Sequence, residues 1–308
     1  MRWLELAPGS RYEGFLAVRT VAVQRTRHGS PYLDLRLWDG ECEITGRCWD
    51  YDGSAPVPRT VILVSGTMEL YNELPQLRIE EWRPAGSNEY DPARFVPESG
   101  RDRQEMWQEL AGLMGTVQDA VLRVVLRRVF ADAEFRRSFA VAPAAVYYHH
   151  ACLGGLLEHT LSVARMVDQM ARQRSDVDRD LALAGAVLHD IGKVFEYDWG
   201  GPFIDFSDAG RFIGHVILGC LHLERALAGA AEVPELTRQK LLHIIASHHG
   251  RREWGAVVEP VLPEAALVHL ADLADGELDK MQAARAEARG ERWGPPVLGL
   301  GRRIWAGD

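Results

Sequence analysis

Residues 181–193 read LALAGAVLHDIGK, and this stretch decides how the second half of the chain folds. Its apolar residues have the spacing of a buried helix, and Gly192 is interpreted as the C-cap of that helix. The pair His189-Asp190 lies at the helix end. A buried carboxylate beside an imidazole is costly unless it is paired or binds a cation, so the pair indicates a metal centre inside a helical domain.

Histidine and aspartate residues recur in helical segments on both sides of this stretch. His159 shares an apolar stripe with Leu156 and Val163 and is therefore expected to point inward. His215 opens one predicted helix, and the pair His248-His249 ends another. Asp272 lies on a further helix, three residues after His269. Imidazoles and carboxylates that converge from separate helices are how metal sites are built inside helical bundles.

The first 83 residues have a different pattern, of short strands separated by turn residues. Strands are predicted at residues 18–23, 32–38, 43–49, 60–68 and 76–82. Five strands in this length favour a small closed barrel, most often of the oligonucleotide-binding (OB) type, with an SH3-like barrel as the alternative.

Alternation along two of these strands predicts which side chains face outward. Leu33, Leu35 and Leu37 point to the core, as do Cys42, Ile44 and Cys48 on the next strand. Aromatic rings beside arginines on an outer face suit base stacking and phosphate contact. Alternatively, these rings cover the barrel where a linker or second domain docks. The candidate substrate-binding residues on this face are Tyr32, Arg36, Trp38, Arg47 and Trp49.

The change of pattern along the chain predicts the domain boundaries. Residues 1–83 are expected to form the barrel, and residues 84–102, rich in Pro, Gly and Asn, a linker. Residues 103–308 are expected to form an all-α domain with an extended C-terminal tail. The fold class is therefore a five-stranded OB-type barrel followed by a helical bundle.

Composition restricts the class of protein. The 308 residues are 47% hydrophobic and 26% charged, with no apolar run long enough to span a bilayer and no signal-like N-terminus. Four scattered cysteines without a C-x-x-C pair are expected to be reduced, so we expect a cytoplasmic protein. A net charge of -9 argues against bulk duplex binding but leaves a local single-strand groove open.

The histidine and aspartate pattern resembles the HD-domain metal-dependent phosphohydrolases. His159, His189-Asp190 and Asp272 resemble the HD signature, and His215 with His248-His249 resembles the additional histidines of two-metal members. The whole chain is similar to the YhaM-like 3′→5′ exoribonucleases, in which an OB domain precedes an HD domain. The shared segments include residues 29–33, 149–151, 154–160, 184–193, 214–215 and 247–255. The hairpin at residues 71–77 departs from the family, where glycine and basic residues are usual.

The resemblance implies a centre of two divalent ions. One ion would be held by His159, His189, Asp190 and Asp272. The other would be held by His215, His248 and His249, with Asp190 as the bridge. Histidine-rich ligands favour transition metals over Mg²⁺; the family suggests Mn²⁺, with Fe²⁺, Ni²⁺, Co²⁺ or Zn²⁺ as alternatives.

Other polar residues near these motifs are assigned to the substrate. Lys193 is expected to stabilise charge on the transferring phosphoryl group, and Asp190 and Lys193 are the catalytic candidates. Arg251 and Arg252 are candidates for binding a neighbouring phosphate. His149 and His150 are candidates for substrate contact, with structural support as the alternative. His222, His243 and His269 are interpreted as structural.

Three functions remain open from the sequence. The resemblance implies an exoribonuclease that acts 3′→5′ on single-stranded RNA, or also on single-stranded DNA, and releases nucleoside 5′-monophosphates. A second possibility is a phosphohydrolase for small nucleotides or cyclic dinucleotides, because the HD core leaves substrate choice to its surroundings. A third is a nucleic-acid-binding protein with a structural metal, which the excess of ligands over four disfavours. Homo-oligomerisation is left open, and no membrane partner is expected.

Overall fold

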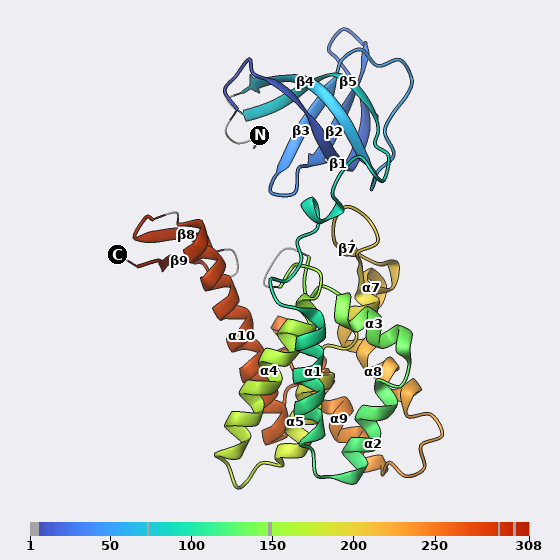
Figure 1. The fold of residues 1–308 in the computed structure, drawn as a ribbon, viewed down its shortest axis with the longest axis vertical. Helices are drawn as coiled ribbons and strands as arrows, with labels where there is room; N and C mark the ends of the chain where they lie inside the picture. The colour runs from blue at the N-terminus through green and yellow to red at the C-terminus, as the bar shows by residue number, and fades with distance from the viewer. Residues whose placement is uncertain (1–5, 73, 147–149, 289, 298–299, 308) are drawn as a thin grey trace. The chain divides into compact units, whose positions relative to one another are not determined.

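The protein consists of two compact units. The structure is a computed structural model and describes residues 6–72, 74–146, 150–288, 290–297 and 300–307. The first unit comprises Met1–Pro97 and Trp199–Ile204, and the second comprises Glu98–Asp198 and Asp205–Asp308. Figure 1 labels the elements of both.

The first unit is a closed five-stranded barrel of the OB type, as predicted. The strand order is β1-β2-β3-β5-β4, and β1 also pairs with β4 to close the barrel. β3 and β5 run parallel and the other neighbours run antiparallel. The strands are β1 (Arg11–Arg25), β2 (Pro31–Trp38), β3 (Glu43–Cys48), β4 (Val61–Tyr71) and β5 (Leu74–Pro84).

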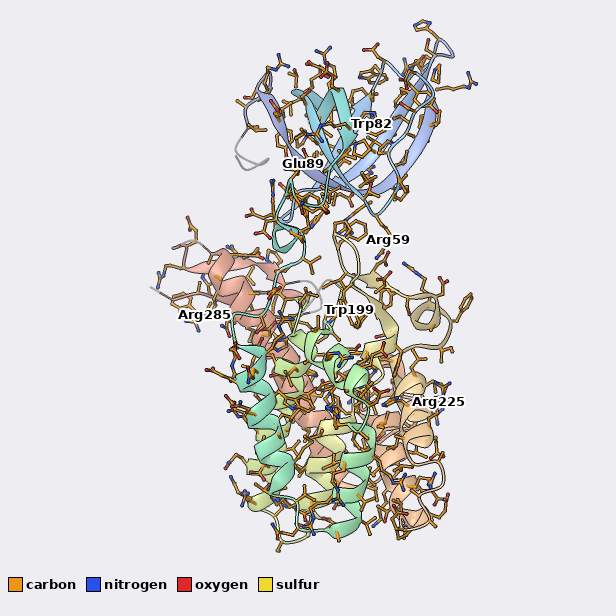
Figure 2. The ribbon with its side chains drawn as sticks, turned by 45° about the vertical axis from the view of Figure 1, so that its right-hand side comes forward. Arg59, Trp82, Glu89, Trp199, Arg225 and Arg285 are labelled. Atoms are coloured by element: carbon orange, nitrogen blue, oxygen red, sulfur yellow. The ribbon has the colours of Figure 1, made fainter. Side chains whose placement is uncertain are left out.

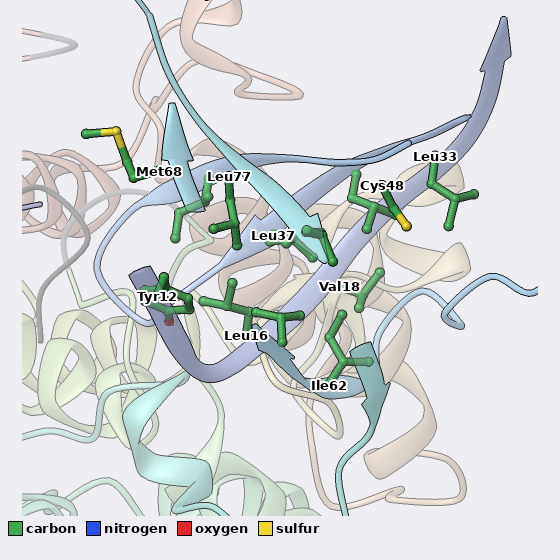
Figure 3. Packing of buried hydrophobic residues seen from close by; sticks show 13 residues of the cluster. Tyr12, Leu16, Val18, Leu33, Leu37, Cys48, Ile62, Met68 and Leu77 are labelled. Carbon is green, nitrogen blue, oxygen red and sulfur yellow. The ribbon is translucent and has the colours of Figure 1, made fainter. Parts of the chain in front are cut away.

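Alternating side chains fill the barrel, and Figure 3 shows this core. Leu33, Leu35 and Leu37 are fully buried, with Ile44 and Cys48 opposite them, as the alternation predicts. Cys42 is only half-buried, because it precedes β3 and packs at the edge of this cluster. The outward positions of β2 and β3 are exposed or half-buried. The period-two pattern therefore fixes which side chains the barrel presents to solvent.

A second cluster forms where two segments outside the strands pack against β1 and β4. Phe95, just after the 3-10 helix η2 (Pro92–Arg94), packs with Ala17, Val61 and Phe203. Residues 84–97, which the sequence predicts as part of a linker, thus belong to the barrel unit. Phe203 comes from a short segment that returns to the barrel from the second half of the chain, and the guanidinium of Arg59 lies 5.2 Å from its ring (Figure 2 labels Arg59).

The second unit is helical, as predicted, with two short antiparallel pairs added. β6 (Tyr197–Asp198) pairs with β7 (Asp205–Phe206). β8 (Trp293–Val297) pairs with β9 (Arg302–Trp305), so the tail predicted to be extended forms a hairpin. The helices are α1 (Arg103–Gly115), α2 (Ala120–Val129), α3 (Ala133–Val141), α4 (Gly155–Arg172), α5 (Arg179–Leu188), α6 (Lys193–Glu196), α7 (Asp208–Ile213), α8 (His215–Ala226), α9 (Glu235–Ser247) and α10 (Pro263–Glu287).

Aspartate residues are the N-caps of several of these helices. Asp102, Asp119, Asp132 and Asp178 precede α1, α2, α3 and α5, and each accepts hydrogen bonds from backbone N–H groups of the first turn. Such caps satisfy donors that have no partner within the helix. α5 is buried along its whole length from Leu181 to Leu188, which makes it the central helix of the bundle. Among the helices that the structure describes, none is long and apolar enough to cross a membrane.

Gly192 has a different role from the C-cap predicted for it. α5 ends at Leu188, and the φ of Gly192 is -68°, in the right-handed helical region. A Cβ atom on Gly192 would lie 1.9 Å from the carbonyl oxygen of His215 and 2.5 Å from the backbone nitrogen of Gly219. The prediction was wrong because the glycine permits close approach of two backbones and not a left-handed turn. This contact brings the His189-Asp190 segment against the first turn of α8.

Replacing this glycine should therefore destabilise the bundle. We expect Gly192→Ala to lower the free energy of unfolding by about 1–3 kcal/mol, the cost of overpacking a tight contact, measured by urea denaturation. Gly112→Ala is the control, because Gly112 lies inside α1 with open space around its Cβ position. That change should raise the free energy of unfolding by about 0.5–1 kcal/mol. Equal stability of Gly192→Ala and the wild type would contradict the close-approach argument.

Candidate metal centre and aromatic barrel surface

The seven side chains predicted as metal ligands converge in the helical unit. They form one group of His159, His189, Asp190 and Asp272, and another of His215, His248 and His249. They come from α4, from the turn between α5 and α6, from the start of α8, from the end of α9, and from α10. Within each group, one candidate ligand atom per residue lies within 4.8 Å of the others. The fold therefore brings together seven side chains that are spread over more than 100 residues of the sequence.

The first group is compact and mostly buried. His159 Nε2 lies 3.2 Å from His189 Nε2, from Asp190 Oδ2 and from Asp272 Oδ1. His159, His189 and Asp190 are almost wholly inaccessible to solvent, and Asp272 is half-buried. Two imidazole nitrogens and two carboxylate oxygens in one cluster are ligands that a divalent transition metal accepts.

The second group contains imidazoles that share the Asp190 carboxylate with the first. His215 Nε2 lies 3.2 Å from His249 Nε2. Asp190 Oδ1 lies 3.6 Å from His215 Nε2 and 3.4 Å from His248 Nε2. Because its Oδ2 belongs to the first group, Asp190 stands between the two groups with one oxygen toward each.

Asp190 is a buried charge that needs positive partners. Both of its carboxylate oxygens are buried, and imidazole Nε2 atoms and the ammonium group of Lys193 lie beside them. Lys193 Nζ lies 2.5 Å from Oδ2. Burial raises the pKa of Asp190, but the charge of Lys193 and of His189 lowers that pKa well below its ordinary value. The carboxylate is therefore ionised, and two buried oxygens that face separate groups of imidazoles fit the coordination of divalent ions.

Oxygen acceptors orient four of the imidazole rings. The Nδ1–H groups of His189 and His248 donate to the carbonyl oxygens of Ala186 and Ile245, each over 2.7 Å. His159 Nδ1 lies 2.7 Å from Asp275 Oδ2. The fourth ring is that of His215, whose Nδ1 lies 2.9 Å from Glu196. An acceptor at Nδ1 directs Nε2 toward the cluster, which is the usual arrangement around ligating histidines.

Asp275 and Glu196 are functional candidates that the sequence analysis missed. Asp275 follows Asp272 by three residues on α10, a spacing that places both on one helix face and could have identified it. Glu196 also accepts a hydrogen bond from the backbone N–H of His215, so it holds both the ring and the start of α8. Its position at the end of the four-residue helix α6 gave no such signal.

His150 lies next to Asp275, one of the two carboxylates that orient the imidazole rings. Its Nε2 is 3.1 Å from Asp275 Oδ2, and its Nδ1 is 3.7 Å from Glu158. Burial lowers the pKa of His150, but Asp275 and Glu158 raise it to about 9. The structure thus places His150 next to the carboxylate that orients His159. His149 lies outside the described residues.

The imidazole pKa values shift in opposite directions in the two groups. Burial lowers the pKa of His159, but the carboxylates of Asp190, Asp272 and Asp275 raise it well above its ordinary value. In the second group, burial lowers the pKa of His248. Burial and the neighbouring His248 and His215 lower the pKa of His249 to about 3. His248 and His249 are therefore neutral near pH 7, the form in which an imidazole binds a metal.

A pocket of about 470 Å³ reaches this centre from the surface. Lys193, His249 and Asp272 line its inner part. Arg251 and Arg252 are exposed, and the Arg251 guanidinium lies 5.1 Å from the ring of Trp254, another lining residue. The remaining lining residues are His269, Leu273, Gly276, Glu277, Lys280 and Leu300. A substrate entering here would meet the candidate ligands directly.

The histidines interpreted as structural have partners that fit packing roles. His222 stacks on Phe135 with 4.0 Å between ring centroids. His243 Nε2 accepts the backbone N–H of Val261. His269 donates Nδ1–H to the carbonyl oxygen of His248 and also lines the pocket.

On the barrel, part of the predicted outer face forms an aromatic surface. The rings of Tyr32 and Trp49 lie 4.5 Å apart, and the Arg47 guanidinium is about 6 Å from both. Arg47 lies closer, 4.7 Å, to the ring of Tyr71, which the sequence analysis did not select because its hairpin departs from the family. We define the aromatic barrel surface as Tyr32, Arg47, Trp49 and Tyr71.

The other two predicted residues of this face have local partners. Arg36 is exposed and donates a hydrogen bond to Thr45. Trp38 packs against the cluster around Phe95, and its indole N–H donates to the Phe95 carbonyl oxygen over 3.1 Å. The structure thus separates Trp38 from the aromatic barrel surface.

Comparison with known proteins agrees with this architecture. Residues 156–276 match the model of the HD domain family. The chain is 27% identical to the 3′-5′ exoribonuclease YhaM of Listeria welshimeri over 306 residues, which covers 98% of this chain and 96% of that protein. It is also 27% identical to the 3′-5′ exoribonuclease YhaM of Bacillus licheniformis, over 96% of this chain and 94% of that protein.

The match to the HD family model falls on the segment that carries the seven predicted ligands, and the alignments with the YhaM relatives include the barrel as well. Divalent metal binding is the property that the HD match and the His/Asp clusters together support. The resemblance to the YhaM-like family is therefore confirmed over nearly the full length of the chain, which contains an HD domain at residues 156–276.

Proposed function

We propose that the protein is a metal-dependent 3′→5′ exoribonuclease that hydrolyses single-stranded RNA to nucleoside 5′-monophosphates in the cytoplasm. The observation that carries this proposal is the Asp190 carboxylate between two groups of ligands, which is the arrangement of a two-metal phosphodiesterase. The 3′→5′ direction and the RNA substrate rest on the similarity to the YhaM enzymes. The free cysteines agree with a reducing compartment.

The residues of the chain have separate tasks in this reaction. When bound, two divalent ions supply positive charge for the phosphoryl oxygens and acidify a water molecule. Asp190 has one carboxylate oxygen beside each ligand group and so sets the spacing between the two groups. Lys193 is buried at the pocket floor; Asp190 and Asp272 outweigh the effect of burial and raise its pKa, so it remains protonated. This ammonium group is positioned to stabilise charge that develops on the phosphoryl group.

The aromatic barrel surface supports a polymeric substrate. Tyr32, Trp49 and Tyr71 offer ring faces beside the Arg47 charge, the combination that sequence-tolerant single-strand binding uses. A phosphohydrolase for small nucleotides is the second candidate, because the pocket volume is in the range of small-molecule sites. A gel assay with end-labelled RNA and DNA strands and Mn²⁺ distinguishes these functions and gives direction and product.

We predict that each chain binds two ions, because seven candidate ligands exceed one tetrahedral site and include a carboxylate able to bridge two ions. Protein purified without chelator and reloaded with Mn²⁺ should contain close to two equivalents by elemental analysis. Mn²⁺ is the metal that we propose, from the family resemblance and the N/O ligand set. A content that stays at one equivalent under saturating Mn²⁺ would reduce the centre to a single ion.

We predict that Asp190→Asn abolishes hydrolysis and leaves single-strand binding largely intact, because Asn keeps the shape but loses the charge between the groups. Asp275→Asn is the matched variant, since Asn still offers an oxygen to His159 Nδ1. It should cost about 10–100-fold in metal affinity or activity, as for residues that support a ligand. Cleavage by metal-reloaded Asp190→Asn at a rate similar to that of Asp275→Asn would contradict the bridging role.

We predict that Tyr32→Ala with Trp49→Ala raises the KM for long oligonucleotides by tens-fold, since each stacked base contributes roughly 1–3 kcal/mol. Hydrolysis of bis-p-nitrophenyl phosphate should change little, because this small diester reaches only the pocket. Val57→Ala is the control, as Val57 is an exposed apolar residue of the same unit. Equal loss on both substrates would assign the rings to the fold, and no loss on either would favour the small-nucleotide candidate.

A further inference from the structure

Trp254 stands out as a large exposed ring beside the candidate metal centre. It lies on the 3-10 helix η3 (Arg252–Trp254), five residues after His249, and is 51% exposed. The same residue lines the pocket whose inner part contains His249 and Asp272. An exposed indole contributes little to the core, so burial in this unit does not account for its position.

Backbone hydrogen bonds fix the loop that carries this ring. The N–H of Trp254 donates to the Arg251 carbonyl oxygen over 3.0 Å, and Ala256 donates to the same oxygen. The N–H of Val257 donates to Ala246 on α9 over 2.9 Å, which ties the loop to the helix that ends at the ligand pair. The position of Trp254 relative to His248 and His249 is therefore set before substrate binds.

The indole has two neighbours, a guanidinium and an imidazole, and about half of its surface is exposed. Arg251 lies 5.1 Å from its ring, a cation–π contact. The ring of His269 is 6.0 Å away and tilted by 38°, so the two rings do not stack on each other. His269 is itself held by its hydrogen bond to His248 and by contact with Gly250, where a Cβ atom would lie 2.3 Å from the imidazole.

We propose that Trp254 is the platform on which the base of the 3′-terminal nucleotide stacks while its phosphate lies at the metal ligands. This inference rests on the proposed exonuclease function. Trp254 lines the same pocket as His249 and Asp272, so one nucleotide can reach the ring and the metal ligands together. Because every base has a π face, an indole platform accepts any terminal base, which suits an enzyme that removes nucleotides one after another.

The test compares two synthetic RNA strands that differ only at the 3′ end, one with an intact terminal nucleotide and one with an abasic terminal residue. The wild type should prefer the intact end in kcat/KM by about 5- to 150-fold, the range for stacking of one base on an aromatic ring. Trp254→Ala should lose that preference, and Trp254→Phe should retain part of it. Phe212→Ala, which removes an 87% exposed ring outside the pocket, should keep the full preference.

A binding measurement separates stacking from catalysis. In the Asp190→Asn background, Trp254→Ala should weaken binding of the intact end and leave binding of the abasic end unchanged. Metal content of each variant shows whether the nearby ligands are preserved. Equal losses by Trp254→Ala on both ends, or sensitivity only to an abasic penultimate residue, would overturn the platform. Failure of the wild type to degrade either strand would instead refute the proposed function.

Discussion

The Asp190 carboxylate imposes the constraint on which the helical unit depends. It is buried and ionised, so it needs positive charge beside it. Lys193 provides one such charge. The surrounding imidazoles require their own acceptors at Nδ1, which is why Glu196 and Asp275 are buried as well. The buried Asp190 charge is thus the centre of a polar cluster of Lys193, the imidazoles and their carboxylate partners. This cluster lies among α4, α5, α8, α9 and α10.

The sequence predicts those parts of the structure that periodic patterns or local chemistry specify. The alternation of Leu33, Leu35 and Leu37 identifies the interior of the barrel, because a strand has one side-chain period whatever its partners. The buried position of the His189-Asp190 pair was also predictable, since a carboxylate next to an imidazole in an apolar helix has few stable environments. Both inferences use residues whose surroundings are implied by their neighbours in sequence.

Features that depend on contacts between distant segments were not predictable. Gly192 was misinterpreted because the His215 carbonyl oxygen that requires a glycine lies 23 positions away. Phe203 packs against Ala17 and Phe95, and nothing in its local sequence indicates a return to the barrel. Tyr71 lies in the hairpin that departs from the family, and nothing in its local sequence indicates that its ring contacts Arg47. In each case the role of the residue depends on a partner that is distant in the sequence, so the local sequence does not reveal that role.

The return of residues 199–204 to the barrel unit affects how the protein is made on the ribosome. The five strands are complete once residue 84 has been synthesised, but Phe203 joins the cluster of Ala17, Val61 and Phe95 only more than 100 residues later. During that interval the nascent barrel exposes an apolar patch. Because residues 199–204 belong to the barrel unit, a fragment ending at Pro97 lacks part of its own core. The two units are thus not modules that can be separated by one cut, and the helical half must be under construction before the barrel is finished.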